Sequence, residues 1–406
     1  MVWPILIDRT HHVGNKIEDK KEIKIHVIER TSWIAAYGQR EIKMDLQEFD
    51  YIICGAGSAG CVVATRLIQE NKGSVLLLEA GGDDNDIFIK MPAGLSEVIP
   101  TKTWDYTTEP QSYTHQRRMS CAQGKVLGGS SSVNGMIYIR GQRQDYDHWQ
   151  QQEGCTGWGY DDLLPYFKKA ECNESLSGHY HGTRGPLHVS ENRHRHPLTQ
   201  TFIRAGQEFG LDYVNDFNGV EQQGVGFFQT TTVNGERASV SKTYLKRVED
   251  NPQLTIKLHA QVHKIRVRQG RAVAVECEIS GRTQVIQARK HIILSAGAIG
   301  SPKILMLSGI GPQPHLEEIG IPVVQNLPVG KNYHDHLHVS INAVTQRPIS
   351  LYGQDLGLQK IKNGAQWMFT RTGVVSSNIL EGGAFVDTNQ EGRPDVQAHF
   401  LPGLDT

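Results

Sequence analysis

A glycine-rich loop that begins at residue 55 constrains the fold of this chain more than any other feature. Residues 55–60 read GAGSAG, which is a GxGxxG pattern. The apolar run Tyr51–Cys54 before the loop predicts a buried strand, and apolar residues at helical spacing follow it. In such a loop the first glycine permits a tight turn, the second lets a pyrophosphate approach the backbone, and the third allows close helix packing. The pattern predicts a dinucleotide-binding βαβ unit.

An acidic residue follows the second strand of this unit. Residues 74–78 predict another buried strand, and Glu79 ends it nineteen residues beyond Gly60. A carboxylate there can accept hydrogen bonds from the hydroxyls of an adenosine ribose. An acidic residue at this position, instead of a basic one, argues against the 2′-phosphate of NADP. The fingerprint alone does not separate NAD from FAD, so both cofactors stay open at this point.

The charge balance and the cysteines limit the partners and the compartment. The chain has 42 Lys and Arg against 43 Asp and Glu, a net charge of −1 without a long block of like charge, which argues against a nucleic-acid partner. No apolar run reaches the roughly eighteen residues of a transmembrane helix. The six cysteines lack CxxC spacing, which fits a reducing compartment. We expect a cytoplasmic protein, with peripheral attachment to a membrane left open.

Apolar patterning in the second half of the chain returns to the dinucleotide-binding sheet. The stretch at about 150–235 is therefore an insertion, and its clearest element is a predicted helix over 198–209. A length of 406 residues predicts two or three domains. Further strands are predicted over 254–258 and 291–294, with a three-stranded meander over 262–267, 272–279 and 283–288 that turns at 269–270 and 280–281. The fold class is α/β, or α+β overall.

A second glycine-rich loop carries a family resemblance. Residues 124–135 read GKVLGGSSSVNG, whose successive amides could wrap an anion or a flavin edge, although an ordinary Ser/Gly turn has the same composition. Residues 124–147 resemble the first signature of the glucose-methanol-choline (GMC) oxidoreductase family, and residues 297–311 resemble the second. The choline dehydrogenase and aliphatic alcohol dehydrogenase branches are the most similar. Shorter matches at 77–81, 329–336 and 376–383 extend the resemblance from about residue 48 to the end.

The resemblance implies an enzyme that uses FAD to oxidise a primary alcohol to an aldehyde, by hydride transfer to the flavin N5. It implies a Rossmann-like FAD-binding domain over 47–340, with a substrate-domain excursion at about 150–235. Residues 341–406 would begin a substrate domain built on an antiparallel sheet, which we expect to be C-terminally incomplete. Residues 1–46 match nothing in this pattern and are either an artefact of start-site choice or a genuine extension.

Individual residues inherit roles from the resemblance by position. Some relatives tether FAD through a histidine just before the asparagine of the second loop, where this chain has Val133, so FAD should be bound non-covalently. The implied cofactor-binding residues are Gly55, Gly57, Ser58 and Gly60 for the pyrophosphate, Glu79 and Ala80 at the ribose, Leu127, Gly128, Gly129, Ser130, Asn134, Gly135, Met136 and Ile137 along the flavin, Val262 at the adenine, and Asp335 and His336 beside the cofactor.

Several histidines could suggest a metal site. They are His179, His181, His188, His194 and His196, but no cysteine or acidic spacing completes a ligand set, so we predict solvated loop histidines and no metal. Trp104 and Trp149 are expected to be packing residues.

The catalytic base is not assignable from this sequence. Alcohol oxidation needs a group that takes the hydroxyl proton, and members of the family supply it from a histidine near their C-terminus. This chain stops at Thr406, and His399 lacks that context. The sequence thus leaves three readings: an alcohol dehydrogenase whose sequence is truncated, an inactive flavin-binding fragment, and an NAD-dependent dehydrogenase. The alcohol and the electron acceptor, oxygen or a quinone, are not determined.

Overall fold

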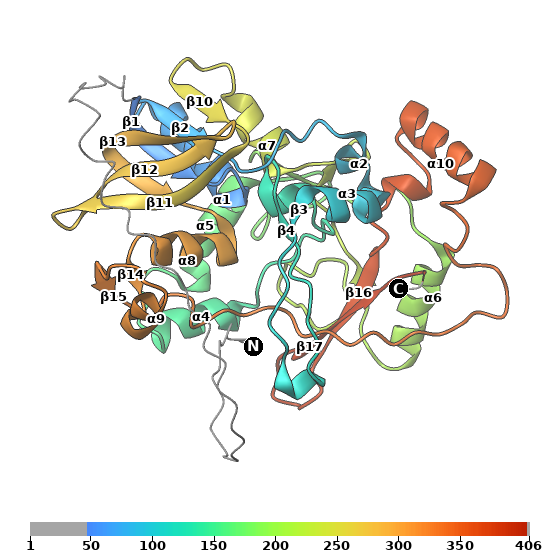
Figure 1. Ribbon diagram of the computed structural model, residues 1–406. Coiled ribbons are helices and arrows are strands. Elements are labelled where there is room, and N and C mark those ends of the chain that lie inside the picture. The colour runs from blue at the N-terminus through green and yellow to red at the C-terminus, as the bar shows by residue number, and fades with distance from the viewer. Residues whose placement is uncertain (1–46, 404–406) are drawn as a thin grey trace, which may run out of the picture.

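The computed structural model describes residues 47–403, so the predictions for residues 1–46 lie outside the described residues. Its main sheet has the strand order β10-β2-β1-β13-β12-β11 (Figure 1). Strands β10, β2, β1 and the end of β13 run parallel, whereas β11, β12 and the start of β13 form an antiparallel meander. The strands are β1 (Glu48–Cys54), β2 (Val75–Leu78), β10 (Leu254–Lys257), β11 (Ala260–Arg268), β12 (Arg271–Ile279) and β13 (Arg282–Leu294).

Both faces of the parallel strands are buried, which explains their continuous apolar sequences. Ile53 and Leu77 pack against helix α1 (Ser58–Gln69) and the region around α7 (Val240–Thr243). Ile52 and Leu76 point to the other face and pack against residues of β11 and β12. Because neighbouring side chains along a strand point to opposite faces, one apolar run supplies both cores.

Strand β13 joins the two halves of the sheet and corrects one prediction. The sequence predicts separate strands over 283–288 and 291–294, but the structure has one strand of 13 residues. The apolar pattern breaks at Arg289 and Lys290, which suggests a turn. Both side chains are instead exposed on the strand and pair with acidic residues of β1, Arg289 with Glu48 and Asp50, and Lys290 with Asp50.

The two predicted turns of the meander are confirmed. Gln269 and Gly270 have φ angles of 49° and 74°, and Ser280 and Gly281 have φ angles of 51° and 73°. Two consecutive residues with positive φ are typical of the tight hairpin turn whose twist matches that of the flanking strands. These turns let the meander fold back over the parallel strands.

A second, antiparallel sheet combines segments from distant parts of the chain. Its order is β17-β16-β7, with β7 (Gly224–Phe227) from the insertion and β16 (Gly382–Val386) and β17 (Val396–Phe400) from the end of the chain. Helix α6 (Pro197–Glu208), predicted over 198–209, packs on it through Ile203. The predicted fold, a Rossmann-like α/β part beside an antiparallel sheet, is confirmed.

The remaining elements connect these two sheets (Figure 1). No helix within residues 47–403 is long and apolar enough to cross a membrane. The other helices are α2 (Ile87–Lys90), α3 (Leu95–Lys102), α4 (Arg143–Gln151), α5 (Tyr160–Ala170), α8 (Gly297–Leu307), α9 (Gln313–Glu318) and α10 (Gly357–Thr370). The short strands are β3 (Thr103–Trp104), β4 (Gln123–Gly124), β5 (Glu171–Asn173), β6 (Leu187–Val189), β8 (Thr232–Val233), β9 (Glu236–Arg237), β14 (Ile310–Gly311) and β15 (Gln325–Asn326).

Gly60→Ala should destabilise the folded chain by more than about 4 kcal/mol, because the added Cβ would overlap a backbone carbonyl group, which cannot move aside as a flexible side chain can. A Cβ at Gly60 would lie 1.9 Å from the carbonyl oxygen of Gly55 and 2.9 Å from the Ser295 hydroxyl. Chemical unfolding of the purified variant measures the loss.

Gly57→Ala is the matched control in the same loop. A Cβ there would meet only the Cα of Gly129, at 3.8 Å. Gly57 is the N-cap of α1, so alanine should cost about 1 kcal/mol. Equal stabilities of the two variants would show that the third glycine has no packing role.

Candidate functional site

A cavity of about 480 Å³ opens where the parallel strands β1 and β2 end. Its volume lies within the range of small-molecule sites, and its position at the carboxyl ends of parallel strands is where α/β sheets bind ligands. Of the residues implied by the family resemblance, eight line this cavity: Gly55, Gly57, Ser58, Glu79, Ala80, Gly129, Ser130 and Val262.

The first glycine loop bends sharply from β1 into α1. Gly55 has a φ of +105°, and a Cβ would lie 2.5 Å from the carbonyl oxygen of Ser295, so both the turn and the packing require glycine. Helix α1 begins after Gly57 without a side-chain cap. Its first amide groups and the positive end of its dipole therefore face the cavity, an arrangement that favours an anion.

The second glycine loop packs directly against the first. The backbone N–H of Gly128 donates to the carbonyl oxygen of Ala56 at 2.8 Å. Gly129 has a φ of +56°, and a Cβ on it would lie 2.6 Å from the Cα of Gly57. The loops can approach this closely because Gly129 lacks a side chain.

Glu79, which follows β2, holds the first loop in place. Its carboxylate accepts hydrogen bonds from the backbone N–H of Ala56 at 3.0 Å and of Gly81 at 2.9 Å. Burial raises the pKa of Glu79, and these two bonds offset only part of that effect. The carboxylate also lines the cavity, so it positions the loop and is available to a ligand.

The cavity wall also contains residues to which the sequence assigned no ligand-binding role. Trp104 stacks on Tyr106 with ring centroids 5.5 Å apart, and the Lys125 ammonium lies 4.3 Å from the centre of a Trp104 ring. Both aromatic side chains line the cavity, so Trp104 packs on Tyr106 and also forms part of the cavity wall. The Ser295–Gly297 turn at the end of β13 also lines it, and its position just after a buried strand was the available signal.

This geometry agrees with the comparisons to known proteins. A family model described as GMC oxidoreductase matches residues 49–338. The chain belongs to the GMC oxidoreductase family. Oxygen-dependent choline dehydrogenase 1 of Chromohalobacter salexigens is 46% identical over 364 residues, which cover 88% of this chain and 65% of that protein.

Two solved structures extend the comparison. Pyridoxine 4-oxidase from Mesorbium loti is 33% identical with a TM-score of 0.66, over 69% of this chain and 55% of that one. An FAD-dependent oxidoreductase from Chaetomium thermophilum is 26% identical with a TM-score of 0.75, over 84% of this chain and 62% of that one. The chain thus spans about two thirds or less of the length of these relatives.

Several implied site residues of this GMC oxidoreductase chain lie outside the cavity. Gly60 is buried behind the first loop, and Asp335 and His336 are exposed. The second loop lines the cavity through Gly124, Gly129 and Ser130. Its other implied residues and those that follow it do not line the cavity: Leu127, Gly128, Asn134, Gly135, Met136 and Ile137. His399 lies on β17 and packs edge-on against Phe228, and burial and the nearby His336 lower the pKa of His399.

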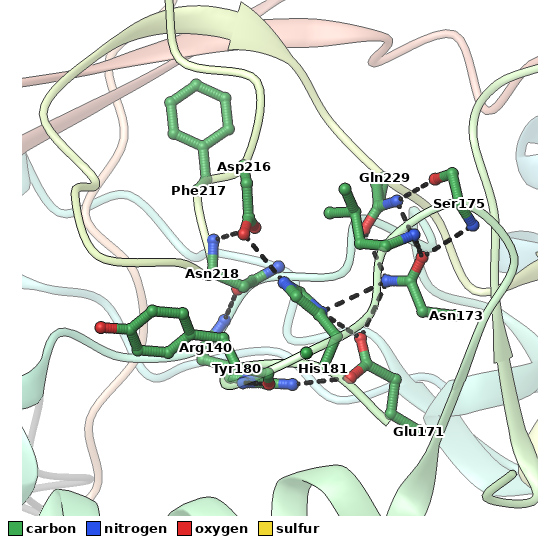
Figure 2. A network of polar contacts seen from close by, with 12 residues as sticks. Arg140, Glu171, Asn173, Ser175, Tyr180, His181, Asp216, Phe217, Asn218 and Gln229 are labelled. Carbon is green, nitrogen blue, oxygen red and sulfur yellow. Dashed lines mark hydrogen bonds and ion pairs between the residues drawn. The ribbon is translucent and has the colours of Figure 1, made fainter. Parts of the chain in front are cut away.

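A buried polar network joins the insertion to the segment that leaves the second loop. Figure 2 shows Glu171 between Arg140 and His181, with Asp216 on the far side of the imidazole ring. Arg140 donates to Glu171 at 2.9 Å, and the two ring nitrogens of His181 lie 2.9 Å from Glu171 and 2.8 Å from Asp216. A ring held between two carboxylates donates from both nitrogens, so His181 is an imidazolium.

The prediction of solvated loop histidines is wrong for two residues. His181 is only 5% exposed, because Glu171 and Asp216 enclose its ring. His196 is only 8% exposed, and its ring caps the start of α6 by accepting from the backbone N–H of Leu198 at 3.1 Å. Sequence spacing gave no sign of the carboxylates of Glu171 and Asp216, which approach His181 only in the fold. Within residues 47–403 no group of three or more His, Cys, Asp or Glu side chains could hold a metal ion.

The His181 network should make stability fall at alkaline pH. Burial disfavours the charged ring, but the hydrogen bonds to Asp216 and Glu171 outweigh burial and raise the pKa of His181 to about 9. A raised pKa stabilises the fold fully below the unfolded value of about 6.5, and this contribution is lost as pH rises through about 9.

Urea unfolding of wild type and His181→Gln from pH 6 to 10 measures this effect. The difference in unfolding free energy should shrink by roughly 3 kcal/mol across that range. His179→Gln, an exposed neighbour in the same loop, is the control and should show no such trend. A pH-independent difference for His181→Gln would mean that the ring is neutral in the fold.

Proposed function

We propose that this chain binds FAD non-covalently in the cavity and provides the cofactor-binding part of an enzyme that oxidises a primary alcohol to an aldehyde. The observation that carries the proposal is Gly57. Gly55 and Gly60 are explained by the protein itself, through a positive φ and through backbone overlap. Gly57 has an ordinary φ of −77°, and a Cβ on it would make one ordinary contact at 3.8 Å, so the protein itself would accept a side chain there and its absence serves a ligand.

The residues around Gly57 fit the parts of FAD. The uncapped start of α1 suits the pyrophosphate, and Ser58 lies there beside the first amides. The carboxylate of Glu79 suits the ribose hydroxyls. The next residue is Ala80 and not a basic residue, which argues against a 2′-phosphate. Val262 would meet the adenine.

When bound, FAD would accept the hydride that leaves the alcohol carbon. The chain's own part is to orient the cofactor through its two glycine loops and to exclude water from the cavity with Trp104 and Tyr106. We assign no catalytic base within residues 47–403. His399 is the histidine to substitute first, because burial and the nearby His336 lower its pKa and favour a neutral ring that can accept a proton, and His336 is the second.

We propose a choline-like or aliphatic primary alcohol as the substrate, with oxygen or a quinone as acceptor. The support is the similarity to the oxygen-dependent choline dehydrogenase of Chromohalobacter salexigens. Anaerobic addition of choline, or of straight-chain alcohols, to the FAD-loaded chain tests the reaction through loss of the flavin's visible absorbance. Bleaching supports alcohol oxidation, whereas a flavin that no alcohol bleaches supports the alternative of an inactive flavin-binding chain.

Purified protein should carry FAD that mild denaturation releases, because Val133 offers no side chain for a covalent link. Chromatography of the supernatant after acid precipitation identifies the cofactor. Recovery of NAD would favour the NAD-dependent alternative, and a flavin retained by the precipitate would contradict non-covalent binding.

Gly57→Val should abolish FAD binding, and Gly57→Ala should weaken it at least about tenfold, or 1.4 kcal/mol, because a side chain occupies the space that the pyrophosphate needs. Fluorescence titration of the apoprotein with FAD measures the affinity. Circular dichroism checks that both variants are folded. Equal affinity of wild type and Gly57→Val would show that the loop has only a structural role.

A further inference from the structure

The turn Asn134–Met136 in the second glycine loop is held by three different segments. The carbonyl oxygen of Asn134 accepts from Arg237 at 2.7 Å, and that of Gly135 accepts from the Asn378 amide at 2.7 Å. The carbonyl oxygen of Met136 accepts from the backbone N–H of Thr231 at 2.8 Å. All three carbonyl groups of the turn are therefore bonded into the protein, which fixes its backbone.

Arg237 is a buried cation without a carboxylate partner. Its side chain is 4% exposed, and no ion pair joins it to an acidic residue among residues 47–403. Its guanidinium donates to the carbonyl oxygens of Ile89, Ser131 and Asn134. One nitrogen, Nη2, has no partner in the described chain. Burial lowers the pKa of Arg237 to about 10.

Such a residue is costly, since a buried charge is normally paired. Arg140, the other buried arginine of this region, shows the usual solution, because it pairs with Glu171 at 2.9 Å. If Arg237 served only to tie carbonyl groups together, a neutral donor would do so without the cost of burying a charge. The uncompensated charge of Arg237 therefore indicates that this residue either pairs with a negatively charged ligand or fixes the orientation of a neighbouring side chain.

The neighbour that Arg237 fixes is the side chain of Asn134. Its Oδ1 accepts from Arg237 at 2.9 Å and from the backbone N–H of Met136 at 3.2 Å. Both bonds require the oxygen, which sets the orientation of the amide. The Nδ2 group is then left as a donor, and it has no partner within residues 47–403. The backbone N–H of Gly135 is likewise unpartnered in this part of the chain.

Asn134 is exposed and directly linked to the cavity. Its backbone N–H donates at 2.9 Å to the carbonyl oxygen of Ser130, and Ser130 is one of the residues that line the cavity. A fixed donor beside the cofactor site can favour the cofactor form that carries more negative charge. The positive charge of Arg237, transmitted through the Asn134 amide, acts in the same direction.

We propose that Arg237 is a positioning residue that holds the Asn134 amide as a hydrogen-bond donor to the flavin, and so raises both the affinity and the midpoint potential of the bound cofactor. The inference rests on the proposed function, because it needs FAD in this site. In this proposal Asn134 contacts the cofactor, and Arg237 acts on the cofactor through Asn134.

Asn134→Asp separates this role from simple fastening of the loop. An aspartate keeps an oxygen for Arg237 and Met136, and it gives the buried cation a carboxylate. The melting temperature of the apoprotein should therefore not fall. The donor is lost and a negative charge takes its place, so the dissociation constant for FAD should rise at least tenfold. Each tenfold preference lost for the reduced cofactor should lower the two-electron midpoint potential by about 30 mV.

Asn251→Asp is the matched control. The Oδ1 of Asn251 also accepts a backbone N–H two residues on, that of Gln253 at 2.9 Å, but this turn precedes β10 at the opposite edge of the sheet. The Asn251→Asp substitution adds the same charge and should change neither the FAD affinity nor the midpoint potential of the bound FAD. Arg237→Lys keeps the charge but loses the fork that engages Asn134, so it should lower both FAD affinity and apoprotein stability.

The experiment uses residues 1–406 with added FAD, and reads melting temperature, affinity and reductive titration against dyes of known potential. A stable Asn134→Asp variant with weakened affinity and lowered potential supports the inference. Wild-type affinity and potential in that variant, or its destabilisation, overturns the inference alone and leaves the proposed function standing. Failure of the wild-type chain to bind FAD overturns both.

Discussion

The peptide group of Ala56 is the contact on which the cavity depends. Its N–H donates to Glu79 at the end of β2, and its carbonyl oxygen accepts from Gly128 of the second loop. Ala56 is fully buried, so neither bond competes with water. The Ala56 peptide group thus holds the first loop between the sheet, through Glu79, and the second loop, through Gly128. Without these bonds, the two glycine-rich loops, whose backbones have large conformational freedom, would not be held in a fixed position relative to each other.

The sheet supplies the rigidity that these loops lack. Both faces of β1 and β2 are covered, one by α1 and the region of α7 and the other by the meander. The carboxyl ends of the strands are therefore fixed before any ligand binds. Strand β13 has a double role, because it pairs with β1 and also carries the meander back across the sheet. This path brings Val262 of β11 to the cavity wall.

Two buried arginines hold the segment that leaves the second loop, and they do so by different chemistry. Arg140 sits in a network of charges with Glu171 and His181, which ties that segment to the insertion (Figure 2). Arg237 touches only carbonyl and amide oxygens and remains uncompensated. The charge of Arg140 is compensated within the protein by Glu171, which indicates a structural role. The arrangement around Arg237 is incomplete within residues 47–403, and it lies where the family resemblance implies the flavin.

The sequence by itself determined the βαβ unit, the strand pattern of the meander and the family. Each of these depends on residues close together in the chain: an apolar run, a GxGxxG loop, or a pair of turn residues with positive φ. The family resemblance also named eight residues that line the cavity. These features are local, so neighbouring residues suffice to encode them.

Only the tertiary structure decided which polar groups meet across long distances. Glu171 and Asp216 enclose His181, Trp104 reaches the cavity, and Arg237 approaches Asn134 from more than a hundred residues away. The sequence also suggested a break at Arg289 and Lys290 that the structure does not have, because acidic partners on β1 keep these residues in the strand. No spacing rule predicts such contacts, since they form when separate segments pack and each buried charge must then find a partner.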